Sequence, residues 1–420
     1  MPNPRPTLTV ADVCAHVAEH VFGSVADPFG LGVELEWLTS QGGSEHRLAE
    51  SEAVALIADL TPLPHGGRLT VEPGGQLELS TAPFRTVDEL CRAASAELAL
   101  LDRACGQNRV ELTALGADPV RTPERVTLAP RYQAMERYFD QLGAAGRTMM
   151  CNTAAIQVNV GLGRPDQVER RWALANHLGP TLIGCFANSP FADGLPSGWQ
   201  SSRLRAWWSL DPSRSAPVRC DLAPVDAWSA YALDARVMLI RVDADRCEPI
   251  IDPLPFGQWL AEGHELGWPT VDDLAYHLTT LFPPVRPKGW LELRMFDALP
   301  SPFWQVAVAV TCALLTTVDA SEEVDEAIAD TTDLWVDAAQ LGLGHPDLAR
   351  SARRVFGLAQ QILRSSGAHP DLLDLVSAYD ERWVSRGRCP ADDHLDAWRL
   401  DGSLPAAGGA EAVAGAGGIR

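Results

Sequence analysis

The chain has 420 residues, and 34 Lys and Arg against 55 Asp and Glu give it a net charge of −21. This excess of negative charge argues against a protein whose main task is to bind nucleic acid or an anionic membrane. The nine cysteines are an odd number without a C-x-x-C pair, which is typical of a reduced cytoplasmic protein. No uninterrupted run of eighteen apolar residues occurs, so we expect no membrane span.

The hydrophobic pattern predicts strands in the first three quarters of the chain and helices in the last. In chain order we expect a helix at 10–22, a strand at 32–37, a hairpin at 68–80, a helix at 87–108, strands at 110–116 and 153–160, a helix at 167–187, a loop with a short helix at 198–212, a strand at 288–296, and helices from 304 to about 398.

These elements favour a single domain over 1–400, with a sheet-bearing part at about 25–300 and a helical part at about 302–400. The end, 401–420, is rich in Ala and Gly and poor in large apolar residues. It cannot bury enough surface to offset the entropy of ordering, so we expect a disordered tail.

Alternate side chains of a strand share a face, and four predicted strands carry acidic, amide or guanidinium groups on one face and apolar groups on the other. The polar members are Glu34, Glu36, Glu72, Gln76, Glu78, Gln157, Asn159, Glu292 and Arg294. Any one such strand fits an ordinary antiparallel sheet with one solvated face. Neighbouring carboxylates, however, raise one another's pKa unless a cation lies among them.

Carboxylate and amide oxygens suit Mg²⁺, which proteins hold with a few carboxylates and the phosphates of a substrate. A Walker-type phosphate loop is absent, because the single lysine, Lys288, follows no glycine-rich run. The polar face therefore predicts a site where metal ions hold a nucleoside triphosphate.

Several segments resemble the glutamate-cysteine ligase family, in the same order from about residue 10 to about 395. The resemblance is greatest to the actinobacterial members that serve ergothioneine biosynthesis. The segments are Gly32-Val-Glu-Leu-Glu36, Val71-Glu-Pro-Gly-Gly-Gln-Leu-Glu-Leu-Ser80, residues 149–159, Asn188-Ser-Pro190, Ser202-Arg203 with Trp207, and residues 276–294.

The resemblance implies a glutamine-synthetase-like α+β fold, in which a curved antiparallel sheet forms a funnel, helices pack outside it and a helical region follows. It implies an ATP-dependent ligase that forms γ-glutamylcysteine from L-glutamate and L-cysteine through γ-glutamyl phosphate, the first step of ergothioneine biosynthesis. Mg²⁺, or Mn²⁺ in its place, would be required. Glutamate, cysteine and ATP would be the partners, in the cytoplasm, without nucleic acid, membrane or an obligate protein partner.

By the same resemblance, Glu292 and Arg294 would be catalytic, Gln76 and Arg294 would bind ATP, and Arg203, Asn159 and Met150 would bind glutamate. The metal ligands would be Glu34, Glu36, Glu72, Glu78, Glu292 and Gln157, although relatives often have His in place of Gln157. The residue types suit this chemistry, because phosphoryl transfer depends on positioning and charge neutralisation, and an Arg fork matches a carboxylate.

Three alternatives stay open. His16-x-x-Glu19-His20 matches the zinc motif of one peptidase class, but no third ligand is evident. A ligase for a different amine acceptor would carry the same strands, since no residue that would recognise the thiol of cysteine can be named. A catalytically inactive nucleotide-binding relative is the third, and the complete set of acidic residues argues against it.

Overall fold

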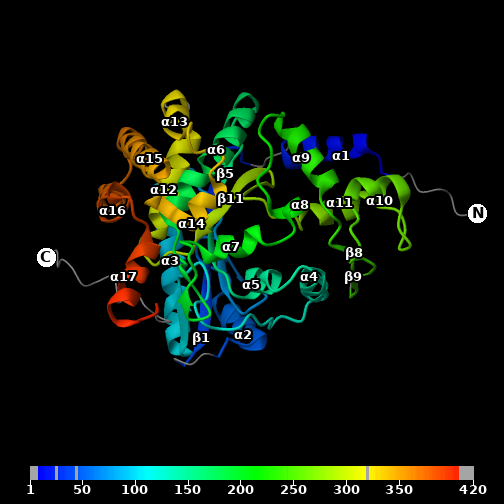
Figure 1. Cartoon of the computed structure of the whole chain (residues 1–420), viewed down its shortest axis with the longest axis horizontal. Helices are drawn as coiled ribbons and strands as arrows, with labels where there is room; N and C mark the ends of the chain where they lie inside the picture. The colour runs from blue at the N-terminus through cyan, green and yellow to red at the C-terminus, as the bar shows by residue number, and fades with distance from the viewer. Residues whose placement is uncertain (1–7, 24–26, 43–45, 244, 318–320, 406–420) are drawn as a thin grey trace, which may run out of the picture.

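The computed structural model describes residues 8–23, 27–42, 46–243, 245–317 and 321–405. At the centre of these residues is a seven-stranded antiparallel sheet with the strand order β10-β11-β5-β1-β3-β2, in which β4 pairs with the far end of β1. Figure 1 labels three of its strands, β1, β5 and β11. The strands are β1 (Leu31–Gln41), β2 (Arg68–Val71), β3 (Leu77–Ser80), β4 (Val110–Thr113), β5 (Ala155–Gly161), β10 (Val285–Pro287) and β11 (Trp290–Asp297).

The register of the sheet places the predicted polar residues side by side. Because β1 is the long central strand, it presents its glutamates to both neighbours, β3 and β5. The facing pairs are Glu36 with Glu78, Glu34 with Gln157, and Glu292 with Asn159.

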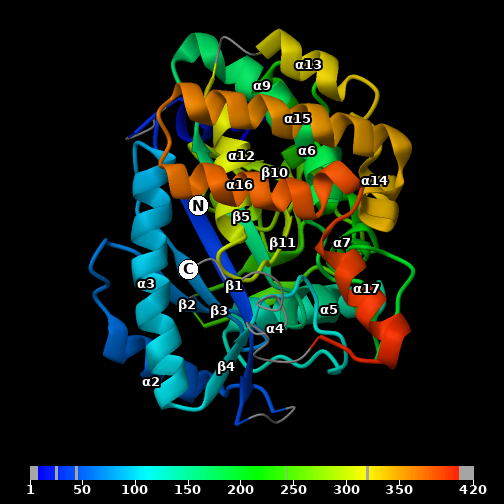
Figure 2. The same ribbon diagram turned by 90° about the vertical axis from the view of Figure 1, so that its left-hand side faces the viewer.

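Helices α3 (Val87–Gln107), α6 (Val168–Phe186) and α12 (Trp304–Thr316) pack against the sheet. Helix α12 is apolar around nearly its whole circumference and is therefore buried, whereas α15 (Pro346–Ser365) and α16 (Pro370–Arg382) are amphipathic and lie outside it (Figure 2). One large apolar core joins these layers.

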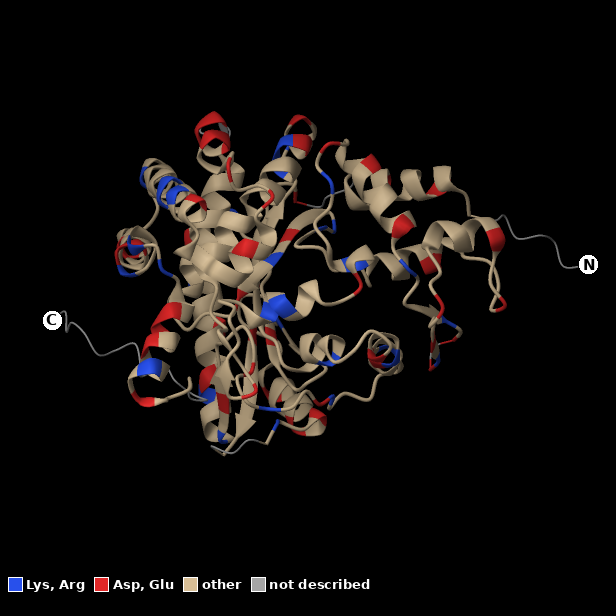
Figure 3. Ribbon diagram, viewed as in Figure 1, with Lys and Arg blue, Asp and Glu red and all other residues tan. Residues whose placement is uncertain are grey.

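The remaining C-terminal helices are α13 (Ser321–Ile328), α14 (Trp335–Leu341) and α17 (Pro390–Asp401). Short 3-10 turns lie before α6, at Pro165–Gln167, and among the C-terminal helices, at Gly342–Gly344 and Val384–Arg386. Figure 3 shows acidic residues on many outer helices, α13 among them, in keeping with the net negative charge. Within the described residues, no helix is both long and apolar enough to cross a membrane.

On the other side of the sheet lie α4 (Pro130–Asp140), α5 (Ala145–Cys151) and α7 (Ser202–Trp208) (Figure 1). Beyond them a lobe with its own small apolar core contains α1, α9, α10, α11 and the β8–β9 hairpin. Its bounds are α1 (Val10–His16), α9 (Pro224–Asp234), α10 (Phe256–Glu262), α11 (Val271–Leu278), β8 (Leu239–Arg241) and β9 (Cys247–Pro249). The other short elements are α2 (Glu50–Leu60), α8 (Pro212–Ser215), β6 (Phe191–Ala192) and β7 (Leu195–Pro196).

Most predicted elements are confirmed, with shifted ends. The prediction of one strand at 288–296 is wrong at its start, because Lys288 and Gly289 form the turn of the β10–β11 hairpin and Gly289 has a φ of +84°. The helix expected at 10–22 ends in a π-helical turn, Val17–Val21, and β4 stops at Thr113.

The predicted disordered tail begins one residue too early, because α17 includes Asp401. Residues 402–405 follow the helix without regular structure, and the part of that prediction from 406 to 420 lies outside the described residues. The single domain over 1–400 and its two parts stay a prediction.

Candidate active site

A cavity of about 420 Å³ lies between the polar face of the sheet and helices α4, α5 and α7. We call it the inner cavity. Its sheet side is acidic and its helix side is largely apolar. The predicted site residues that line it are Glu34, Glu36, Glu72, Gln76, Glu78, Met150, Gln157, Arg203 and Arg294.

A second cavity, of about 670 Å³, adjoins the first and is called the outer cavity. The two share the side chains of His20, Glu34, Glu78 and Lys288 along their common border. The outer cavity is further lined by Asp27, Arg68, Ser80, Asn159 and Trp290, among others.

Hydrogen-bond donors from the same strand or a neighbouring segment contact the carboxylates of the sheet. Glu36 accepts hydrogen bonds from the Ala155 backbone N–H (2.9 Å) and from Gln157 Nε2 (2.7 Å). Glu78 accepts from the hydroxyl groups of Thr70 and Ser80, both at 2.9 Å.

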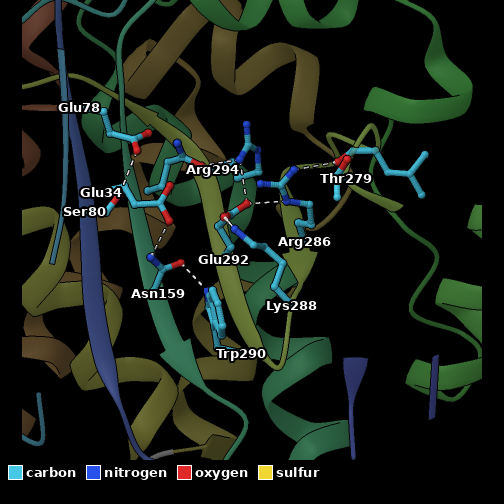
Figure 4. Close-up of polar contacts among 12 residues, drawn as sticks. Glu34, Glu78, Ser80, Asn159, Thr279, Arg286, Lys288, Trp290, Glu292 and Arg294 are labelled. Atoms are coloured by element: carbon cyan, nitrogen blue, oxygen red, sulfur yellow. Dashed lines mark hydrogen bonds and ion pairs between the residues drawn. The ribbon is translucent and has the colours of Figure 1, made fainter. Parts of the chain in front are cut away.

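Glu34 belongs to a chain of hydrogen bonds that reaches the outer cavity. Asn159 Nδ2 donates to Glu34 at 3.1 Å, and the indole N–H of Trp290 donates to Asn159 Oδ1 at 2.9 Å (Figure 4). The Lys288 ammonium lies 5.2 Å from the centre of the Trp290 ring.

The sheet-side carboxylates repel one another. Burial, followed by the charges of Glu292 and Glu78, raises the pKa of Glu34 to about 7, and burial with Glu78 raises the pKa of Glu36 to about 7. The pKa of Glu72 is raised well above its usual value, first by burial and then by Glu78 and Glu36. A cation among these oxygens would relieve the repulsion.

This donor set suits a hard divalent cation, since it offers carboxylate oxygens next to a cavity large enough for substrate phosphates. Among the residues that the structure describes, no three acidic, His or Cys side chains converge closely enough to hold an ion as they stand. The glutamates would therefore have to turn towards a bound ion.

Glu292 has a different environment from the other glutamates. Its buried carboxylate forms ion pairs with Arg286 Nε at 2.7 Å, Lys288 Nζ at 2.8 Å and Arg294 Nη1 at 2.7 Å (Figure 4). Burial alone would raise the pKa of Glu292, but Arg286, Arg294 and Lys288 outweigh it and hold that pKa far below its usual value. Glu292 is not among the residues that line either cavity.

Arg294 lines the inner cavity from an irregular stretch of β11. The pairing of β11 with β5 is regular to Leu293 and resumes at Phe296, so Arg294 lies in the irregular stretch between them. Its Nη1 also donates to Gln157 Oε1. Bulges of this kind re-aim side chains next to active sites.

Arg203 enters the inner cavity from α7, whose N-terminus Ser201 caps. Its side chain is 3% exposed, and its Nη2 donates to the backbone carbonyl of Arg294 at 2.7 Å. Its Nη1 lies 3.9 Å from the buried carboxylate of Asp297. Arg203 Nε and Nη1, and Arg294 Nε, find no hydrogen-bond partner among the described residues.

Two predicted site residues have other contacts. The amide of Gln76 is used by backbone groups, because it accepts from Gly74 N–H and donates to the carbonyls of Met150 and Thr153. Asn159 lines the outer cavity, so the structure does not bring it to Arg203, with which the sequence grouped it.

Arg286 was missed by the sequence analysis, although it lines the inner cavity and holds Glu292. A signal was present in the sequence. Around a turn centred on Gly289, Arg286 falls directly opposite Glu292 in the β10–β11 hairpin. Arg131, Tyr132 and Thr279 also line the cavity and were not predicted.

The peptidase motif gains no support from its geometry. The rings of His16 and His20 are 4.6 Å apart, and Glu19 approaches His20 only to 4.0 Å, with its side chain 74% exposed. His20 instead lies at the border of the two cavities.

Comparison with known proteins decides the family. The profile described as Glutamate-cysteine ligase family 2 (GCS2) matches residues 30–414. The chain belongs to this family. Its fold and the family predicted from the sequence are therefore confirmed.

Curated relatives cover most of the chain. "Glutamate--cysteine ligase EgtA" of Mycobacterium tuberculosis is 38% identical over 387 residues, which are 89% of this chain and 87% of the relative. The protein of the same name from Mycolicibacterium smegmatis is 40% identical over 377 residues, or 88% and 87% of the two chains.

Two solved structures share the fold at 15% sequence identity. A bifunctional glutathione synthetase from Pasteurella multocida has a TM-score of 0.55 and covers 91% of this chain and 51% of its own. A glutamate–cysteine ligase from Francisella tularensis, solved in complex with AMP, has a TM-score of 0.54 and covers 91% and 87%.

Proposed function

We propose that the protein is an ATP-dependent ligase that joins the γ-carboxyl group of L-glutamate to the amine of L-cysteine. The observation that carries this proposal is the inner cavity, which four glutamates line together with two arginines, each of which has at least one buried N–H group without a hydrogen-bond partner among the described residues. Membership of the glutamate-cysteine ligase family and the EgtA relatives support it.

The acidic side of the cavity suits Mg²⁺, or Mn²⁺ in its place. Glu34, Glu36, Glu72 and Glu78 would hold the ions, and Gln157 would support them through its hydrogen bond to Glu36. Bound there, the ions would neutralise the triphosphate and polarise the phosphoryl group that is transferred.

Within the family's chemistry, ATP would phosphorylate the γ-carboxylate of glutamate, and the amine of cysteine would displace phosphate. Arg294 would stabilise the charge that develops on the phosphoryl group, since its guanidinium is fixed in advance by Glu292 and Gln157. Arg203 would bind a carboxylate of glutamate through its free N–H groups.

The nucleoside of ATP would bind in the outer cavity, which Lys288 and Trp290 line. The cavity is large enough, and Lys288 lies at its border with the glutamates, where phosphates would pass. Glu292 already forms ion pairs with three basic side chains, so its proposed role is to position Arg286, Lys288 and Arg294. To bind a metal ion, Glu292 would have to break at least one of these ion pairs.

We place the reaction in the cytoplasm and in ergothioneine biosynthesis, with small molecules as the only required partners. Nine cysteines without a disulfide among the described residues suit a reducing compartment. The EgtA relatives favour the pathway.

A phosphate-release assay with ATP, Mg²⁺, glutamate and each amino acid in turn tests the proposal. Cysteine should give the highest kcat/KM. Faster release with another amine would indicate a different acceptor, and no release with any acceptor would indicate a nucleotide-binding protein without turnover.

A further inference from the structure

One indole contacts both arginines of the inner cavity. The guanidinium carbon of Arg203 lies 5.7 Å from the centre of the Trp207 ring, and that of Arg294 lies 5.6 Å from it. The two arginines come from different elements, α7 and β11, and the Trp207 ring is the surface that they share.

Two like charges are thus held close together in a buried place. Arg203 Nη2 donates to the backbone carbonyl of Arg294, so the two residues are in direct contact. Each has its own buried carboxylate nearby, Asp297 for Arg203 and Glu292 for Arg294, and the charge of Glu36 attracts both guanidinium groups. The face of an indole attracts cations, and this attraction is stronger where water is excluded.

The position of Trp207 is itself fixed by the fold. Ser201 caps α7 and donates its hydroxyl to Asp297, which is the last residue of β11. The Trp207 ring also packs edge to face against Phe282, at 5.8 Å between ring centres. Trp207 is 8% exposed, so the indole has little room to move.

We propose that Trp207 is a positioning residue that holds Arg203 and Arg294 together, so that their unpartnered N–H groups act on one anionic substrate group. This inference rests on the proposed function and adds to it a coupling between glutamate binding and phosphoryl transfer. The free donors are Nε and Nη1 of Arg203 and Nε of Arg294, which suit an acyl phosphate or the carboxylate from which it forms.

The test compares Trp207→Phe, which keeps a weaker aromatic face, with Trp207→Met, which fills space without one. We expect the KM for glutamate to rise by about tenfold and kcat to fall by about tenfold in Trp207→Met, with the KM for ATP within twofold of wild type. Trp207→Phe should lie between wild type and Trp207→Met in both parameters.

Trp208→Met is the matched control, because Trp208 is the next residue of α7 and packs instead against Trp335, at 6.4 Å between ring centres. It should lose thermal stability without a change in the KM for glutamate. Calorimetric titration of glutamate into each variant gives a readout that does not require turnover.

A second arm measures coupling. Arg203→Lys should raise the KM for glutamate less in Trp207→Phe than in wild type, since the ring contact is already weakened. Additive effects in this cycle would overturn the inference, as would a Trp207→Phe enzyme with wild-type kinetics. If wild type released no phosphate with any amine, the proposed function would fail instead.

Discussion

The two arginines of the inner cavity differ in the step that each would serve. Arg203→Ala should raise the KM for glutamate at least tenfold and leave the KM for ATP nearly unchanged, because its free N–H groups would bind glutamate in the ground state and the transition state alike. Arg203→Lys should recover part of the binding, since it keeps the charge and loses the fork.

Arg205→Ala is the control for this change, because Arg205 lies on the same helix and is exposed. Initial rates over a matrix of glutamate and ATP concentrations separate the two KM values. Normal glutamate saturation in Arg203→Ala would remove Arg203 from the glutamate site.

Arg294→Ala should lower kcat by about 10²- to 10³-fold, because the guanidinium is preorganised where charge would develop. Single-turnover measurements at saturating substrate would isolate this step. A drop confined to the KM for glutamate would contradict the assignment of Arg294 to phosphoryl transfer.

His277, in the small lobe, should make the protein less stable in acid. Burial lowers its pKa to about 3, and its ring stacks on Phe256 while Nε2–H donates to the Ala232 carbonyl at 3.0 Å. The unfolded chain therefore binds the proton more tightly, and stability is lost as the pH falls below 6.5.

Between pH 6.5 and 5 this loss is about 2 kcal/mol for a group of this kind. His277→Gln keeps a donor but cannot titrate, so urea titrations should show a smaller loss than wild type over that range. Parallel pH profiles for the two proteins would contradict the argument. The comparison must use the difference between them, because the raised pKa values of Glu34 and Glu36 act with the opposite sign.

At the scale of elements, the β10–β11 hairpin supplies most of the positive charge of the site. Its turn needs Gly289, whose φ of +84° strains any residue with a Cβ although no atom would clash with one. Gly289→Ala should cost about 1 kcal/mol of folding stability. It should also lower kcat, because Arg286, Lys288 and Glu292 depend on that turn.

Gly194→Ala is the matched control for Gly289→Ala. Gly194 lies in the β6–β7 turn with a φ of +77°, and no atom would clash with a Cβ there either. Thermal unfolding should show similar losses for both variants. Only Gly289→Ala should lose activity; equal activities would mean that the hairpin does not organise the site.

The elements also show what the sequence could predict. Alternation of apolar and acidic residues was enough to assign Glu34, Glu36 and Glu78 to one face, because strand geometry is strictly periodic. It could not reveal the β-bulge at Arg294 or the hairpin turn at Lys288 and Gly289, since both interrupt that period.

Side-chain partners were less predictable than faces. Gln76 lies where the pattern put it, yet its amide serves backbone groups of the α5–β5 junction. Arg203 was found only through resemblance, because nothing in a short helix predicts which side chain enters a cavity. Arg286 shows that pairing across a turn carries information that faces alone do not.

For the whole molecule, we expect the sheet and the helices opposite it to form one site that requires a cation. EDTA should abolish activity and Mg²⁺ or Mn²⁺ should restore it, while Glu36→Ala should stay folded and lose nearly all turnover even at saturating Mg²⁺. Circular dichroism checks the fold. Full activity in EDTA would contradict the assignment of the acidic face to metal.

In the proposed reaction, ATP phosphorylates the γ-carboxyl group of glutamate, and the γ-glutamyl group is then transferred to the amine of cysteine. Glutamate labelled with ¹⁸O in its γ-carboxyl group tests it directly. If an acyl phosphate forms, one labelled oxygen moves to inorganic phosphate in each cysteine-dependent turnover, which mass spectrometry detects. Release of phosphate without the label would contradict this reaction, whether or not γ-glutamylcysteine accumulates.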